Sequence, residues 1–283
     1  MPEFHPTAQK GFGAGTNELY DRARPTYQPV ALDHIRNSLK EKKDLNIVEQ
    51  VFHHATLIGA GTGIFTRAVL KDPQWNSLIK ELKAFEPSEG MRDVFTKTVA
   101  HDGRVSIAEG YFDSVHVEDG WADLVVIAQA FHWCPDYNAA AKEFARILKP
   151  TGCVAFIWNL EDRDRADWVG KIRDTIEVYE KGAPQFRHMR WKETFEKPAY
   201  QQNFEPPQQE IWDYHITATE ESVVERASSK SYIAMLPDDK KKEVQDEVRR
   251  IINQDTSKVW MDKSQGTFEY PYKTYVVICH KKS

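Results

Sequence analysis

Residues 58–66 read Ile-Gly-Ala-Gly-Thr-Gly-Ile-Phe-Thr, so that three glycines recur at every second position. A short apolar run, 55–58, precedes them, and a segment that favours a helix, 65–70, follows. A strand, a glycine turn and a helix in this order are typical of α/β folds that bring their backbone close to a nucleotide-like ligand. Glycine suits the turn because it adopts positive φ and has no side chain to block the ligand. We therefore expect an α/β fold whose first strand ends at Gly59.

Strand-like segments alternate with helical ones along the rest of the chain. Residues 122–128 are nearly all apolar, as a strand buried on both faces should be. We expect further strands at 82–85, 105–108, 153–158, 211–216 and 274–279, and helices at 30–39, 91–99, 138–148, 220–235 and 238–253. The alternation predicts a doubly wound, mostly parallel sheet of seven strands with helices on both faces.

Length and composition indicate one large globular domain. The chain has 283 residues, of which 41% are hydrophobic and 29% charged. Residues 160–207 are charged, aromatic and interrupted by proline, so we expect a cap insertion there, above the sheet. Residues 1–29 are predicted to form a flexible N-terminal lid, and 30–283 the domain that carries the cap.

Charge and cysteine content narrow the class of partner. The net charge is −5 and no basic stripe is present, which disfavours nucleic acid. The three cysteines are odd in number and far apart, as in a reduced, cytoplasmic protein. No apolar run reaches the roughly 20 residues that span a membrane, and the polar N-terminus does not read as a signal peptide. We expect a cytoplasmic protein with a small-molecule partner, no membrane contact and no metal, and we favour a monomer.

The acid that follows the second expected strand narrows the ligand. Glu86 stands where a carboxylate in such folds binds both hydroxyls of a ribose. A protein that binds NADP would prefer a basic residue at this position. The alternative is an ordinary acid at a strand end, but the sequence Glu-Pro-Ser-x-x-Met that begins at Glu86 favours a ligand.

The chain resembles the class I S-adenosylmethionine-dependent methyltransferases over nearly everything from Tyr20 to His280. Residues 58–63 look like their first motif, 85–91 like their ribose-binding turn, 128–133 like the end of their fourth strand, and 148–152 like their turn before strand five. The resemblance implies a Rossmann-like fold, with S-adenosylmethionine as cofactor and S-adenosylhomocysteine as product. It implies these cofactor-binding residues: Tyr20, Arg24, Gly59, Ala60, Gly61, Thr62, Gly63, Glu86, Pro87, Ser88, Met91, Gly110, Tyr111, Phe112, Gln129 and Ala130.

A narrower resemblance concerns the acceptor. Residues 20–27 look like the Y-x-x-x-R-P-x-Y entry segment of trans-aconitate-methyltransferase-like enzymes, and Ser231, Tyr232 and 271–274 also fit that group. The group includes fungal carboxyl methyltransferases and dithiol S-methyltransferases of the gliotoxin type. It implies S-methylation of a thiol or dithiol metabolite of secondary metabolism, which we favour because no strong base is obvious. The alternatives are O-methylation of a small carboxylic acid such as trans-aconitate, and a non-catalytic protein that only binds S-adenosylmethionine.

One position departs from the family. An acid usually stands two residues before the first glycine and helps to hold the amino group of the cofactor, but here that position is Leu57. Glu49 lies further back, and removal of residues 50–57 would restore the family pattern. Either these eight residues are an insertion and Glu49 is the displaced acid, or the strand is 51–58 and the acid is lost.

The acceptor side is expected to be aromatic and dry, because methyl transfer needs alignment of donor and acceptor and exclusion of water. His132 is the candidate for acid–base help, since its pKa ordinarily lies near neutrality; the alternative is a hydrogen-bonded structural residue. Arg24 is predicted to clamp a carboxylate of cofactor or acceptor, or to anchor the lid. The expected walls of the acceptor pocket are Tyr27, Phe131, Trp133, Trp158, Asn159 and Tyr272.

Two further patterns, and one alternative class of protein, have weaker support in the sequence. Arg163 and Arg165 alternate with acids, which is more typical of a solvated loop than of an acceptor site. His53 and His54 have no neighbours at a familiar metal-ligand spacing. A nucleotide-dependent oxidoreductase remains an alternative class, but no Tyr-x-x-x-Lys follows the fifth strand.

Overall fold

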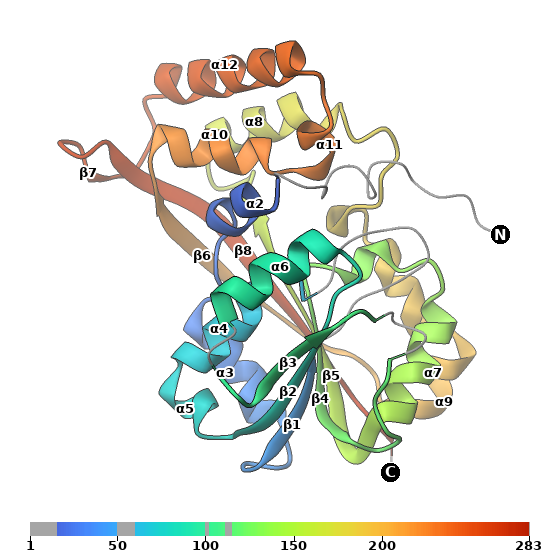
Figure 1. Ribbon diagram of the computed structural model, residues 1–283. Coiled ribbons are helices and arrows are strands. Elements are labelled where there is room, and N and C mark those ends of the chain that lie inside the picture. The colour runs from blue at the N-terminus through green and yellow to red at the C-terminus, as the bar shows by residue number, and fades with distance from the viewer. Residues whose placement is uncertain (1–15, 50–59, 100–101, 111–114, 283) are drawn as a thin grey trace.

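A single mixed sheet forms the centre of the molecule (Figure 1). The computed structural model describes residues 16–49, 60–99, 102–110 and 115–282. The strand order is β3-β2-β1-β4-β5-β8-β6, and β7 pairs with β8 outside this path. The strands are β1 (Leu45–Glu49), β2 (Ile79–Phe85), β3 (Val105–Ala108), β4 (Ala122–Ala128), β5 (Leu148–Glu161), β6 (Gln208–Ala218), β7 (Trp260–Asp262) and β8 (Thr267–His280).

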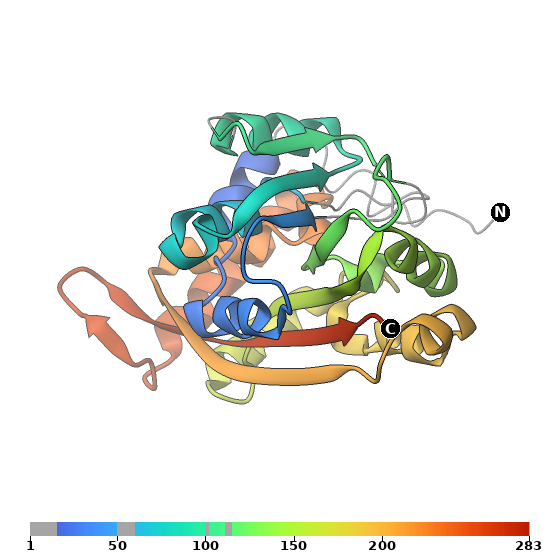
Figure 2. The same cartoon turned by 90° about the horizontal axis from the view of Figure 1, so that it is seen from below.

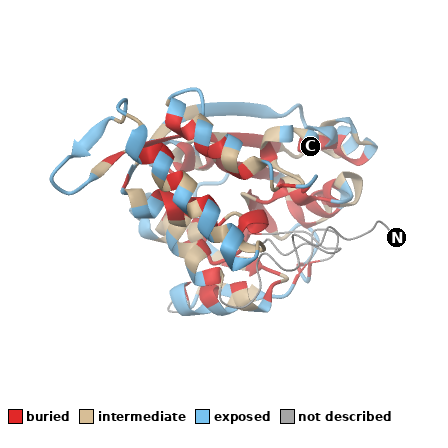
Figure 3. Ribbon diagram, turned by 90° about the horizontal axis from the view of Figure 1, so that it is seen from above, coloured by how far each residue is buried: buried red, intermediate tan, exposed pale blue. Residues whose placement is uncertain are grey.

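The first five strands pair in parallel, whereas β8 runs antiparallel to both β5 and β6. Parallel pairing requires crossover connections, and the helices between the strands supply them. The mostly parallel Rossmann-like α/β sheet expected from the sequence is thus confirmed. The short strand β7 was not expected; it forms a projecting hairpin with β8, and its neighbour Val259 is exposed (Figure 3).

Helices cover both faces of the sheet, as Figure 2 shows from below. One core cluster joins α3, α4, α5 and α6 to one face, and a second joins α7 and α9 to the other. A third cluster packs α8, α10 and α12 around the outer end of β8. The helices are α2 (Asn17–Ala23), α3 (Pro29–Ser38), α4 (Ile64–Lys71), α5 (Pro73–Asn76), α6 (Glu89–Val99), α7 (Tyr137–Ile147), α8 (Asp167–Glu177), α9 (Pro198–Asn203), α10 (Glu220–Ser228), α11 (Ser231–Ala234) and α12 (Asp238–Gln254).

Strand β4 shows why an apolar run predicts a central strand. Val125 and Ile127 belong to one core cluster, whereas Leu124 and Val126 belong to the other. Successive side chains of a strand point to opposite faces, so both faces of β4 are covered by apolar groups. The prediction of a buried strand at these residues is confirmed.

The first strand lies earlier in the chain than the segment 55–58, where it was first expected, and its end at Glu49 agrees with the alternative of an insertion after that residue. The strand between β2 and β4 is Leu45–Glu49, and all five residues are buried. The segment 55–58, expected to be that strand, lies outside the described residues, as do Gly59 and Leu57. Both segments are apolar enough for a strand, and periodicity could not choose between them. Two further predictions need correction, since the expected helix 220–235 is divided into α10 and α11, and β5 continues to Glu161.

The N-terminal helix α2 lies between α6 and α10, above the sheet (Figure 1). Asp21 forms an ion pair with Arg67 at 2.6 Å, and Arg22 forms one with Glu225 at 2.7 Å. The Asn159 amide donates to the carbonyl of Thr26 at 3.0 Å. These ties hold α2 and the segment after it over the carboxyl ends of the strands. None of the helices in the described ranges has the length and apolar character that crossing a membrane requires.

Candidate active site

The site lies at the point where the strand order of the sheet reverses. Strands β1 and β4 are neighbours, and the chain continues from β1 to one side and from β4 to the other. In open α/β sheets, ligands bind in the crevice outside the carboxyl ends of the strands at this point. Glu49 ends β1, Glu86 follows β2, and Gln129 follows β4. The topology therefore gathers three polar side chains at one edge.

The glycine turn supplies backbone that no other residue would form easily. Gly61 has φ of 57° and Gly63 has φ of 85°, both in the left-handed region. A Cβ on Gly63 would lie 2.7 Å from Val99 and 2.9 Å from Phe95, so close packing against α6 also requires glycine. Gly63 is the N-cap of α4, and Ile64 and Phe65 of its first turn line the pocket beside the glycine turn.

Glu86 is fully buried behind this turn. Its carboxylate accepts from the backbone N–H of Gly61 and of Ser88, each at 2.9 Å. The Ser88 hydroxyl accepts from the N–H of Met91 at 3.3 Å. Gly110, after β3, packs so tightly that a Cβ would lie 2.4 Å from Phe85. The predicted ribose-binding turn is thus held rigidly beside the glycine turn.

Glu49 is the second carboxyl group of the crevice. Its side chain is buried and accepts a hydrogen bond from the hydroxyl of Thr66. Burial, and to a lesser extent the charge of Glu86, raise the pKa of Glu49 to about 8. Two alternatives were open for the family's acid: either Glu49 is the displaced acid, or the acid is lost and Leu57 stands at its position. Glu49 stands at the end of the central strand, whereas Leu57 lies outside the described residues.

A pocket of about 380 Å³, part of it open to solvent, lies beside the glycine turn. Ala60, Gly61 and Thr62 line one side, and Tyr20 and Arg24 line the other. The hydroxyl of Thr62 is buried and has no partner in the described part of the chain. An unpaired buried hydroxyl, tight glycine backbone and an arginine line this pocket. The carboxyl groups of Glu86, bonded to Gly61, and of Glu49, bonded to Thr66, are buried near the glycine turn and do not line the pocket. Together these groups fit a ligand with hydroxyls, an ammonium and a carboxylate. S-adenosylmethionine has all three groups.

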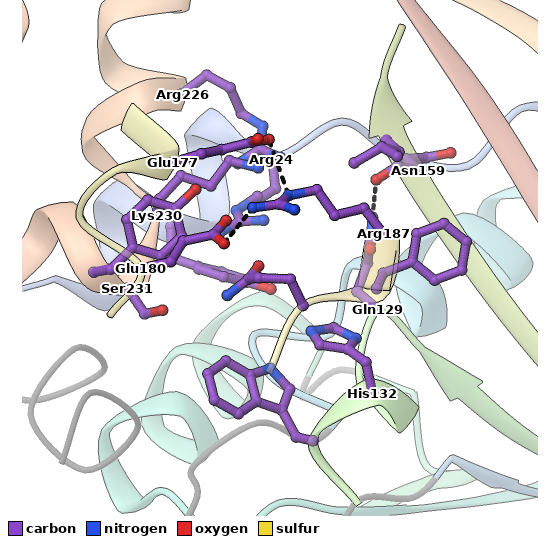
Figure 4. Close-up of a pocket in the computed structure, with 16 residues that line it drawn as sticks. Arg24, Gln129, His132, Asn159, Glu177, Glu180, Arg187, Arg226, Lys230 and Ser231 are labelled. Carbon is purple, nitrogen blue, oxygen red and sulfur yellow. Dashed lines mark hydrogen bonds and ion pairs between the residues drawn. The ribbon is translucent and has the colours of Figure 1, made fainter. Parts of the chain in front are cut away.

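Figure 4 shows a second pocket, which shares part of its lining with the first. It holds about 620 Å³ of empty space, part of it open to solvent. Tyr20, Arg24 and Gln129 line both pockets and form their border. Gln129 has φ of 60°, a conformation uncommon outside glycine, and its amide donates to the carbonyl of Asn159 at 2.9 Å. Strained backbone of this kind is often kept where a side chain must be aimed at a ligand.

Cationic side chains gather in the second pocket. Glu161 is 2% exposed and is shared by Arg226, at 2.6 Å, and Lys230, at 3.1 Å. Burial raises the pKa of Glu161, but the two cations outweigh it and the net pKa is lowered. Burial, and then repulsion by Arg226, lower the pKa of Lys230 to about 7. Arg24 stacks on the Tyr20 ring at 4.4 Å and donates to the carbonyl of Ser229 at 3.1 Å.

His132 faces the same pocket from the other side (Figure 4). Its Nδ1 accepts from the indole N–H of Trp158 at 3.4 Å, which leaves the proton of the neutral ring on Nε2. Burial, followed by the positive charges of Arg24 and Lys230, lowers the pKa of His132 to about 3. The imidazole is therefore neutral at physiological pH and offers the pocket a donor.

Comparison with known proteins identifies the family. Residues 56–156 match the family described as "Methyltransferase domain". A methyltransferase-like protein of Schizosaccharomyces pombe is 31% identical over 233 residues, which cover 82% of each chain. The chain belongs to the class I S-adenosylmethionine-dependent methyltransferases. A malonyl-[acyl-carrier protein] O-methyltransferase of Calditerrivibrio nitroreducens is 24% identical over 169 residues, 56% of this chain and 62% of the relative. A methyltransferase of Anaeromyxobacter dehalogenans has the same fold, with a TM-score of 0.58 at 14% identity, covering 92% and 97% of the two chains.

The methyltransferase fold places the predicted cofactor residues in two groups. Glu86, Pro87, Ser88, Met91 and Gly110 lie at or beside the ribose-binding turn. Those that line the first pocket, which is the candidate cofactor pocket, are Tyr20, Arg24, Ala60, Gly61, Thr62 and Gln129. Ala130 is fully buried in the core beside them. Gly59, Tyr111 and Phe112 lie outside the described residues.

The second pocket is the candidate acceptor pocket of this methyltransferase, and several residues predicted to line it lie elsewhere. Trp133 and Asn159 line it as expected, but Tyr27 lines the cofactor pocket. Phe131, Trp158 and Tyr272 are at most 1% exposed and form the core behind the wall. Trp158 stacks on Phe186 at 4.6 Å, and the Tyr272 hydroxyl accepts from Arg226 at 3.2 Å. The core around these large rings is already full, so they do not contact a ligand directly. They instead support the residues that line the pocket.

The charged lining of the methyltransferase's acceptor pocket was missed. Glu177, Glu180, Arg187, Arg226 and Lys230 all line it, and they come from α8, α10 and the loops that follow these helices. No local motif marks them, because they meet only when the cap folds over β5. Arg163 and Arg165 are exposed, as expected of a solvated loop, and His53 and His54 lie outside the described residues.

Proposed function

We propose that this methyltransferase transfers the methyl group of S-adenosylmethionine to a carboxylate oxygen of a small acidic acceptor. The proposal rests on the charge of the side chains that line the acceptor pocket. Four cations line it: Arg24, Arg187, Arg226 and Lys230. Three carboxylates face them, those of Glu177 and Glu180 in the lining and that of Glu161 between Arg226 and Lys230. Partly buried cations that outnumber carboxylates favour an anionic guest, because the guest removes their mutual repulsion.

The state of His132 supports an acceptor that needs no base. With a pKa of about 3 and Nδ1 occupied by Trp158, the imidazole takes no proton near neutral pH. Carboxylic acids are ionised at this pH without help, since their pKa is near 4. In this proposal the Nε2–H of His132 orients the acceptor, and His132 is not the base expected from the sequence.

The proposal also names the residues that would hold the cofactor. When bound, S-adenosylmethionine supplies an electrophilic methyl group on a sulfonium. We propose that Glu86 holds the ribose hydroxyls and that Glu49 pairs with the ammonium, as the displaced acid of the family. The border formed by Tyr20, Arg24 and Gln129 aligns donor and acceptor, and residues 1–29 and 160–207 serve as lid and cap that keep water out.

The thiol or dithiol acceptor expected from the sequence is the second candidate. The same cations would lower the pKa of a thiol and favour the thiolate. Trp133 and Phe186 add apolar surface to the pocket. Against it stands the surplus of cationic groups, which a neutral dithiol leaves uncompensated. The malonyl-[acyl-carrier protein] O-methyltransferase relative adds weight to oxygen as the methylated atom. In either case we place the reaction in the cytoplasm, with a monomer as the active form.

Methyl transfer from labelled S-adenosylmethionine tests the proposal. The acceptor panel contains short dicarboxylic acids, their dimethyl esters and dithiols at matched concentration, and the product is treated with alkali. We expect label on the dicarboxylic acids in a form that alkali releases, as a methyl ester. Alkali-stable label on the dithiols, with none on the acids, would assign the reaction to sulfur.

A further inference from the structure

A third hollow shares part of its lining with the acceptor pocket and none with the candidate cofactor pocket. This outer hollow holds about 640 Å³ of empty space, part of it open to solvent, beneath the end of β5. Asp162, Arg163 and Lys273 line it and do not line the acceptor pocket. Leu160, Glu177 and Arg187 line both hollows, so these three side chains form the wall between them.

Arg187 is one of the two charged side chains in this wall, and Figure 4 shows its guanidinium between Glu177 and Glu180. Its guanidinium pairs with Glu177, Nε to Oε1 at 3.2 Å, and with Glu180. Both carboxylates have other partners, since Arg173 lies 2.6 Å from Glu177 and His188 lies 3.4 Å from Glu180. Neither acid would therefore be left alone if Arg187 moved.

The surroundings of Arg187 allow it to move. It belongs to a 3-10 segment of three residues, Phe186–His188, and Met189 after it has φ of 57°. The side chain of Arg187 is 28% exposed, so part of it already contacts solvent. Glu177 on α8 and Leu160 on β5 belong to regular elements and form the fixed part of the wall.

We propose that Arg187 is the specificity-determining partition that sets the length of the acceptor. With Arg187 in place, the pocket ends at its guanidinium, and a short acceptor is enclosed. An acceptor with a longer chain would have to displace Arg187 from Glu177 and Glu180 and extend into the outer hollow. This inference rests on the proposed function for the identity of the acceptor, but the partition itself does not depend on it.

The first test compares acceptor lengths. In the wild type, kcat/KM for methylation should be higher for butanedioic acid than for octanedioic acid. Arg187→Ala should raise the ratio of long to short acid by about tenfold or more, while the absolute rates fall because a cation is lost. Arg163→Ala is the matched control. Arg163 also pairs with Glu177, at 4.0 Å, but it lines only the outer hollow and not the acceptor pocket. Arg187→Gln, a milder change, should give an intermediate ratio, and an unchanged ratio in both Arg187 variants would overturn the proposal.

The second test requires no turnover. Ser231 lines the acceptor pocket and not the outer hollow, and the native cysteines are buried. A cysteine is introduced by Ser231→Cys, and its labelling by a charged methanethiosulfonate reagent is timed with and without Arg187→Ala. We expect labelling to become several times faster, and an equal rate would overturn the partition. If labelling becomes faster but the protein methylates none of the acids, the partition is supported and the proposed acceptor is refuted.

Discussion

The shared carboxylate of Glu161 leads to a prediction about pH. Lys230 and Arg226 divide this carboxylate between them. Burial, and then repulsion by Arg226, lower the pKa of Lys230 to about 7, although the charge of Glu161 opposes the shift. An anionic acceptor binds best when Lys230 is protonated. Its affinity is therefore fully present below pH 7 and declines as the pH rises through this value. A thiol acceptor predicts the opposite trend, because its thiolate fraction rises toward pH 8.5.

The size of the effect follows from the contact that is lost. A hydrogen bond to a charged group contributes about 1.5–3 kcal/mol, and Lys230 is only 14% exposed, so solvent screens it weakly. Neutralisation of Lys230 should thus lower kcat/KM for a dicarboxylic acid by about 10- to 150-fold. Lys230→Gln should show this loss at every pH. Lys230→Arg should retain a high value across the range, because arginine stays protonated.

The assay is the pH dependence of kcat/KM from pH 6 to 9 for the wild type and both variants, at saturating S-adenosylmethionine. Saturation removes effects of Glu49 on cofactor affinity. The wild type should match Lys230→Arg at low pH and approach Lys230→Gln at high pH. Parallel profiles for all three proteins would refute the assignment of Lys230, and a profile that rises with pH would point to a thiol.

Further predictions concern the cofactor side and the fold. Glu86→Gln should weaken binding of S-adenosylhomocysteine by about 10- to 150-fold in calorimetry, with little change in Tm; equal affinity would refute the ribose assignment. His132→Ala should lower kcat by less than about tenfold without adding or removing a pH inflection between 5 and 8, as expected for one neutral hydrogen bond. Because the pKa of Glu49 is raised to about 8, the native state retains a proton that the unfolded chain loses, so the free energy of unfolding should fall between pH 5 and 8; Glu49→Gln should flatten that slope in denaturant titrations. Gly63→Ala should lower the free energy of unfolding by about 1–3 kcal/mol, since its Cβ would meet Val99, and a change within error would contradict the packing.

Most of the sheet could be predicted because its strands carry local signals. The run Ala122–Ala128 is apolar on both faces, and Glu86 follows a strand and precedes a turn. The order of the strands along the chain then limits the topology of the sheet, because parallel strands joined by crossover connections can be arranged in few ways. The sequence left two positions open for the first strand because two apolar segments precede the glycines, and only pairing with β2 and β4 identifies Leu45–Glu49.

The acceptor pocket was harder to predict because its chemistry is assembled from distant segments. Glu161 meets Arg226 and Lys230 across more than 60 residues of sequence, and each alone reads as a surface charge. Large aromatic residues gave a misleading signal. Trp158 and Tyr272 are conspicuous in the sequence, yet they pack behind the wall and hold His132 and Arg226 in place.

The most direct test of the central claim is calorimetric titration of a short dicarboxylic acid into the complex of the protein with S-adenosylhomocysteine. The claim is that the second pocket holds an anion beside the cofactor. We predict saturable binding of the acid that weakens with salt and disappears in Lys230→Gln, and no binding of its neutral dimethyl ester. Binding of a neutral dithiol with no signal for the acid would contradict the account.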